Sequence, residues 1–150
     1  MKRNVDVSVT GIHVRAGEPA EKIITNSKGY YEFLEDGTRV LEYDEEQQAG
    51  SESVHIHNTV TIAQDENSME IVRGGDMNSK LAFGKELKYD TEYVTPYGTM
   101  QMKVNTTKFD FTKIRQEDEM KLMAEYELEM DGQVLSASMI IIEIKNSEPV

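Results

Sequence analysis

One arginine stands where the alternation of a strand would carry it into a protein interior. Met69 and Ile71 define an apolar face, and Arg73 falls on that face two residues later. A guanidinium inside a fold needs an anionic partner, because desolvating a lone charge is costly. Arg73 could therefore anchor the acid group of an amphipathic ligand. An internal salt bridge to a glutamate, or a bulge at Gly74 that turns Arg73 outward, is the commoner arrangement, since charges inside folds are usually paired.

Hydroxyl and thioether side chains follow on neighbouring predicted strands. Tyrosine combines an apolar body with a polar tip, which suits the polar end of a ligand, but it is also a common strand residue. Methionine can line a pocket for varied apolar shapes, and its commoner use is to fill irregular gaps in a core. Methionines expected on the inner face are Met69, Met100, Met102, Met120, Met130 and Met139. The sequence therefore predicts a ligand-binding set of Arg73, Tyr93, Thr95, Tyr97, Met100, Met102 and Tyr126.

Two histidines are the candidates for a metal site. His55 and His57 lie on one face of a predicted strand, about 7 Å apart. Such a pair can supply two ligands to zinc, with a third from His13 or a carboxylate. Their face is the polar one, shared with Thr59 and Thr61, so exposure to solvent explains them without a metal. We predict neither a metal nor a cofactor.

Catalytic patterns are missing from the sequence. There is no cysteine, and no Gly-x-Ser-x-Gly elbow occurs. Gly74-Gly75 lacks the lysine and the following helix of a phosphate-binding loop. Glu125, Glu127 and Glu129 alternate onto a polar face, where solvated carboxylates that protect a sheet are expected. We therefore predict no catalytic residue.

The elements that must position these residues are strands. The apolar residues recur with a period of two in about ten segments, joined mostly by short turns. Asp36-Gly37 and Asp131-Gly132 predict tight hairpins, because Asp-Gly supplies the positive φ angles that such turns require. The pattern predicts an all-β fold, an antiparallel up-and-down β-barrel of about 8–10 strands, as one domain over residues 1–150.

Three stretches need a local interpretation. Residues 120–130 are rich in helix formers, but their apolar residues alternate without a miss, which favours a strand. Apolar residues occupy odd positions up to Val9 and even positions from Ile12, so we expect a bulge or bend at Gly11. Residues 15–28 are expected to form a loop with a short apolar piece at Ile23-Ile24.

Several sequence motifs resemble those of the small bacterial family of YwiB-like proteins. They are Arg73-Gly74 before Leu81-Ala82-Phe83-Gly84, the run from Tyr93 to Thr99 before Met100, Met102 and Val104, and the run from Tyr126 to Gly132 before Ser136 and residues 140–142. The similarity spans nearly the whole chain. It implies a calycin-like, that is lipocalin-like, barrel. The family has no assigned activity, so the resemblance implies no site residues.

The charge and composition of the chain argue against some classes of binding partner. The net charge is −12, from 28 acidic and 16 basic side chains, and a field of that sign repels phosphate backbones and anionic lipid surfaces. The first residues lack an apolar run like that of a signal peptide, and the longest apolar stretch, residues 139–142, is far too short to span a bilayer. We expect a cytoplasmic protein that binds neither nucleic acid nor membranes.

Three hypotheses for function follow. The first is a non-enzymatic barrel that binds a small apolar or amphipathic molecule in a cavity. The second is a filled barrel that binds another protein or forms a homodimer through an exposed apolar patch, with Met123 and Phe109 as first candidates. The third is an enzyme, since fold analogy cannot decide between binding and catalysis. An open cavity surrounded by Arg73, a tyrosine and an inward carboxylate would favour the third.

Overall fold

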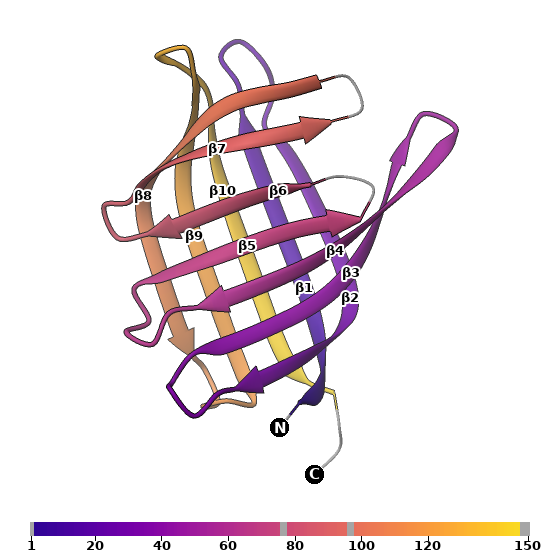
Figure 1. Ribbon diagram of the computed structural model, residues 1–150, viewed down its shortest axis with the longest axis vertical. Coiled ribbons are helices and arrows are strands. Elements are labelled where there is room, and N and C mark those ends of the chain that lie inside the picture. The colour runs from indigo at the N-terminus through magenta and orange to yellow at the C-terminus, as the bar shows by residue number, and fades with distance from the viewer. Residues whose placement is uncertain (1, 76–77, 96–97, 148–150) are drawn as a thin grey trace.

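The computed structural model describes residues 2–75, 78–95 and 98–147, without the side chains of residues 47–49 and 93–95. Ten strands account for most of this part of the chain (Figure 1). No helix in the described ranges is long and apolar enough to cross a membrane. The strands are β1 (Arg3–Val14), β2 (Glu21–Phe33), β3 (Arg39–Ala49), β4 (Glu52–Ile62), β5 (Ser68–Gly75), β6 (Ser79–Gly84), β7 (Lys88–Thr95), β8 (Gly98–Lys113), β9 (Glu119–Met130) and β10 (Gln133–Asn146).

The strands form one antiparallel sheet in the order β6-β5-β4-β3-β2-β1-β10-β9-β8-β7. Neighbours in the sheet are neighbours in the sequence, except that β1 pairs with β10. The two end strands approach each other, where the Thr91 hydroxyl of β7 donates a hydrogen bond to the Lys80 carbonyl of β6. The sheet thus curls into a nearly closed barrel (Figure 1). This confirms the predicted all-β, up-and-down, calycin-like barrel.

The hairpin predictions are confirmed at both Asp-Gly pairs. Asp131 and Gly132 have φ angles of 53° and 78°, as a two-residue turn with positive φ at both positions requires. Gly37 has a φ of 92°, and the Leu34 amide donates a 2.8 Å hydrogen bond to the Thr38 carbonyl. The strand over residues 120–130 is confirmed as β9. Its even-numbered residues from Met120 to Tyr126 are buried.

Two local predictions were wrong. β1 runs through Gly11 in unbroken register with β10, pairing Val9 with Ile142 and His13 with Ser138, so no bulge lies there. Gly11 and His13 therefore continue the inner face of Val9, while Ile12 and Val14 face outward. The predicted loop over residues 15–28 is also corrected, because β2 already begins at Glu21. The described bulges lie instead at Val134/Ser136 and Thr106/Lys108.

The inner face is filled with apolar side chains over the half of the barrel that lies away from the β9–β10 hairpin. Met69 and Met120 are fully buried there, which is the gap-filling use of methionine. The Phe83 and Tyr126 rings, with centroids 4.8 Å apart, mark the limit of this packed region. Its fully buried members include Val5, Leu41, Ile62, Phe83, Leu122, Ile142 and Ile144.

Candidate functional site

The inner face changes from apolar to polar toward the barrel end that carries the β9–β10 hairpin. A cavity of about 180 Å³ lies in this half of the interior. Val9, Gly11, Ile23, Ile71, Leu81 and Ile140 form its apolar wall. Its polar wall consists of His13, Thr25, Tyr43, Glu45, Asn58, Arg73 and Tyr126. The cavity is therefore amphipathic, and we call it the Arg73 cavity.

Arg73 points inward and is held by a carboxylate. Its Nη2 donates a 2.9 Å hydrogen bond to Oε1 of Glu45, and Nδ2 of Asn58 donates to the same oxygen over 2.9 Å. The Arg73 and Glu45 side chains are 18% and 12% exposed. The barrel register explains the contact, because Arg73 pairs with Asn58 on β4 and Asn58 pairs with Tyr43, two residues from Glu45 on β3. The internal ion pair considered from the sequence is present, and β5 does not turn Arg73 outward.

Two tyrosines flank this ion pair. Burial raises the pKa of Tyr126, although a hydrogen bond with Ser138 and the Arg73 charge act in the opposite direction. Burial, followed by the negative charge of Glu45, raises the pKa of Tyr43, with Arg73 again opposing. Both phenols therefore stay neutral and able to donate hydrogen bonds at neutral pH, where a carboxylic acid is ionised.

Ser138 connects the tyrosine to a histidine. Its Oγ lies 2.9 Å from Nδ1 of His13 and 3.3 Å from Oγ of Ser136, and it shares a hydrogen bond with Tyr126. Both serines are buried. Sequence reasoning missed Glu45, Asn58, His13 and Ser138 as members of this site. The alternation of Leu41, Tyr43 and Glu45 on β3 was the available signal for Glu45.

The other predicted ligand-binding residues lie elsewhere or outside the described structure. Tyr93 and Thr95 belong to β7, but their side chains are outside the described part, and Tyr97 lies outside the described residues altogether. Met100 is 41% exposed, and half-buried Met102 borders a separate shallow hollow that Asp131 and Gly132 also line. The structure thus brings Arg73 and Tyr126 together, without Met100 or Met102.

The two histidines weighed as metal ligands lie on the outer face of β4. His57 Nδ1 is 2.6 Å from Oδ1 of Asp44, and His55 Nδ1 is 3.3 Å from Oε1 of Glu46. Each histidine thus has its own carboxylate neighbour on β3. Among the described residues, no group of three or more histidine, aspartate or glutamate side chains is arranged to hold a metal ion.

A second charged cluster occupies the opposite end of the barrel. The Arg39 guanidinium lies between the Phe33 and Phe111 rings, 4.7 and 5.0 Å from their centroids. Its Nη2 is 2.8 Å from Oε1 of Glu117, and its Nη1 is 3.1 Å from Oε2 of Glu66. Arg39 is only 4% exposed. Within the described residues, the Arg39 guanidinium is thus paired with two carboxylates and packed against two aromatic rings.

The Arg39 cluster also orders the turn between β8 and β9, where Glu117 lies. The Tyr31 hydroxyl donates to Oε2 of Glu117. Burial and the Glu117 carboxylate raise the pKa of Tyr31. For Glu117, burial acts to raise the pKa, but hydrogen bonds from Arg39 and Tyr31 and the Arg39 charge outweigh it, so the pKa is lowered. Sequence reasoning missed this cluster, because a turn residue carries no alternation to mark it as inward-facing.

Comparison with known proteins places the fold. A search of the curated proteins finds no match. The structure is similar to the crystal structure of the YwiB protein from Bacillus subtilis, with a TM-score of 0.81, 16% sequence identity, and coverage of 98% of this chain and 94% of that chain. The YwiB-like resemblance read from the sequence is thus confirmed. The family model described as a domain of unknown function, DUF1934, matches residues 7–142. The chain therefore belongs to the DUF1934 family of proteins of unknown function.

Proposed function

We propose that this protein binds a small amphipathic acid in the Arg73 cavity. The observation that carries the proposal is a guanidinium, 18% exposed, in the polar wall of a cavity whose other wall is apolar. A guanidinium has five N–H donors, and within the described residues Arg73 uses Nη2 on Glu45. The remaining donors suit the planar, two-oxygen geometry of a carboxylate.

The cavity size limits the ligand. Sites for drug-sized molecules span roughly 300–1,000 Å³, whereas the Arg73 cavity measures about 180 Å³. A short-chain acid fits this volume better than a long lipid. Its acid group would meet Arg73, with hydrogen bonds from Tyr43 or Tyr126. Its apolar part would contact the wall formed by Val9, Ile71 and Ile140.

Because the protein is strongly acidic, it can attract an acid ligand only at short range. A net charge of −12 repels an approaching anion at long range. The ionic attraction that holds an acid must therefore come from Arg73 at short distance, where Glu45 competes for it.

Binding accounts for this arrangement better than catalysis does. An arginine, tyrosines and an inward carboxylate do surround the cavity, which is the arrangement that would favour an enzyme. However, Oε1 of Glu45 already accepts hydrogen bonds from Arg73 and Asn58, and both tyrosine pKa values are raised. A general base or a phenolate nucleophile needs the opposite conditions. These groups act instead as fixed hydrogen-bonding partners.

Native mass spectrometry of the freshly purified protein tests the proposal. We expect a stoichiometric adduct that is lost on denaturation, and an organic extract of the same sample should contain a small carboxylic acid in matching amount. The Arg73→Met variant, purified in parallel, should carry less of it. An adduct-free wild-type protein whose extract contains no acid would contradict the proposal, as would equal loading of both proteins.

A further inference from the structure

The outward side of four adjacent strands carries a connected apolar area at one end and charged residues at the other. We call it the outer face of β2, β1, β10 and β9. Because register pairs the strands residue by residue, its side chains fall into rows across the sheet. One row is Ile24, Thr10, Ile141 and Met123, and the next is Lys22, Ile12, Met139 and Glu125. Val14 and Ala137 continue the apolar area in a third row.

This apolar area is only partly covered within the monomer. Ile24 and Val14 are 55% and 45% exposed. A hollow of about 280 Å³ lies beside Ile12, Val14 and Met139. Of the two residues that suggested an interaction surface in the sequence, Phe109 is buried in the core, whereas half-buried Met123 belongs to this face. Connected apolar patches of this kind usually mark interaction sites.

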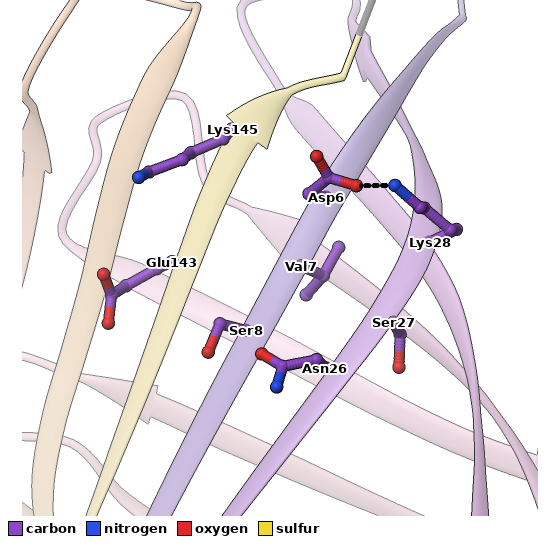
Figure 2. A pocket seen from close by; sticks show the side chains of 8 residues that line it. All are labelled: Asp6, Val7, Ser8, Asn26, Ser27, Lys28, Glu143 and Lys145. Carbon is purple, nitrogen blue, oxygen red and sulfur yellow. Dashed lines mark hydrogen bonds and ion pairs between the residues drawn. The ribbon is translucent and has the colours of Figure 1, made fainter.

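Charged residues continue the face toward the chain termini. Figure 2 shows a second hollow here, of about 520 Å³, lined by Asp6, Lys28, Glu143 and Lys145 among others. The row at this end is Lys28, Asp6, Lys145 and Glu119, in which Asp6 and Lys28 form an ion pair. Charge therefore alternates along the row, with a lysine at the β2 edge and a glutamate at the β9 edge.

We infer that this outer face binds a second copy of the chain, across a two-fold axis that runs along the strands between β1 and β10. Such an axis reverses the order of strands, so β2 of one copy faces β9 of the other and β1 faces β10. Opposite charges then meet at three positions: Lys22 faces Glu125, Lys28 faces Glu119, and Asp6 faces Lys145. In the apolar rows Ile24 faces Met123, Ile12 faces Met139, and Thr10 faces Ile141.

A two-fold axis across the strands does not give this match. It would keep the strand order and invert the rows instead, so the charged Glu143 would face Met139 and Ser8 would face Ile12. Only the axis along the strands places opposite charges opposite each other and apolar residues opposite apolar residues, so we infer that axis. The same match explains how identical chains of net charge −12 could associate despite their overall repulsion.

The available area suits a weak dimer. Four strands spaced about 4.8 Å apart, with five rows at about 6.8 Å, span on the order of 600–700 Å² per copy. Two copies would bury about 1,300 Å², at the low end of the roughly 1,200–2,000 Å² of specific interfaces. We therefore expect a dissociation constant in the micromolar range.

Charge reversal at Lys22 and Glu125 tests the interface and its symmetry together. In the monomer neither side chain forms an ion pair with another described residue. Lys22→Glu alone and Glu125→Lys alone each create two like-charge contacts and should weaken dimerisation at least tenfold. An equimolar mixture of the two variants, and the double variant by itself, restore opposite charges at both contacts and should dimerise like the wild type.

Sedimentation velocity over a concentration series of about 0.1–100 μM, which spans a micromolar dissociation constant, gives the readout. We expect the wild type, the mixture and the double variant to approach twice the chain mass of 17.1 kDa with the same dissociation constant, and each single variant to dimerise with a dissociation constant at least tenfold larger. Circular dichroism should show the same fold for all, because both sites are on the surface. A wild type that is monomeric at about 100 μM, single variants that dimerise with the wild-type dissociation constant, or a mixture that dimerises no better than the single variants would each overturn the inference.

Discussion

Replacing Arg39 with methionine is expected to lower the free energy of unfolding by about 3 kcal/mol. Removing one partner of a buried ion pair typically costs about 3–5 kcal/mol, because the other charge is left unpaired. The low end applies here, since the Glu117 and Glu66 side chains are 31% and 34% exposed and can gain water. For a chain of 150 residues this loss corresponds to a fall of about 6–12 °C in Tm. Urea denaturation and calorimetry measure both quantities.

Two comparisons show whether the loss of stability in Arg39→Met comes from the buried ion pairs or merely from removing a positive charge. Lys113, 41% exposed and 3.3 Å from the same Glu66 oxygen, is the matched control, and Lys113→Met should cost less than about 1 kcal/mol. The second comparison is the acid limb of stability. Because the pKa of Glu117 is lowered in the folded state, its contribution is present above the ordinary glutamate pKa and is lost as pH falls through the folded value. As pH falls through this range, the Arg39→Met variant should lose less free energy of unfolding than the wild type, because its Glu117 no longer has the arginine partner. Equal losses in the two proteins would contradict a stabilising ion pair between Arg39 and Glu117.

Replacing Arg73 with methionine is expected to weaken the binding of a small carboxylic acid by about 10- to 100-fold. A hydrogen bond to a charged group contributes about 1.5–3 kcal/mol, and each 1.4 kcal/mol is a factor of ten in affinity. Met retains much of the side-chain volume and removes the guanidinium. Arg15→Met is the matched control, because Arg15 is an exposed arginine just beyond β1. That variant should bind with wild-type affinity in a calorimetric titration.

The Glu45→Gln variant distinguishes ligand recognition from structural damage. Glu45 competes with an acid ligand for Arg73 in the proposed site, so its neutral replacement should tighten binding of the acid. General damage to the cavity would instead weaken binding in both variants. Opposite changes in Arg73→Met and Glu45→Gln therefore support direct contact between Arg73 and the ligand, and changes of the same sign would argue against it.

Local sequence rules predicted the elements and the direction of Arg73. Alternation identified β9 despite its helix-forming residues, because strand burial depends on period and not on intrinsic propensity. The Asp-Gly pairs predicted the turns, since the required φ angles are a local property. Arg73 was expected on the inner face from Met69 and Ile71 alone. Each of these features is decided within a few residues.

The remaining features depend on pairing between distant strands. Glu45 and Asn58 meet Arg73 through the register of β3, β4 and β5, which no single segment specifies. Glu117 reaches Arg39 from a turn 78 residues away in the sequence. The error at Gly11 has a different cause. Apolar Ile12 and Val14 were assigned to the interior, whereas the interior there is polar and the apolar side chains lie outside, on the face for which we infer a second copy.

We propose that the barrel binds a small acid at the Arg73 end and not at the Arg39 end, where the guanidinium is paired with Glu117 and Glu66. The most direct measurement is a titration of the ¹⁵N-labelled wild-type protein with hexanoate, followed by NMR. We expect saturable shifts, with one dissociation constant, in the signals of Gly11, His13, Asn58 and Arg73. Signals around Arg39 and Glu117 should stay in place. Shifts confined to the outer surface, or no shifts at millimolar hexanoate, would contradict the account.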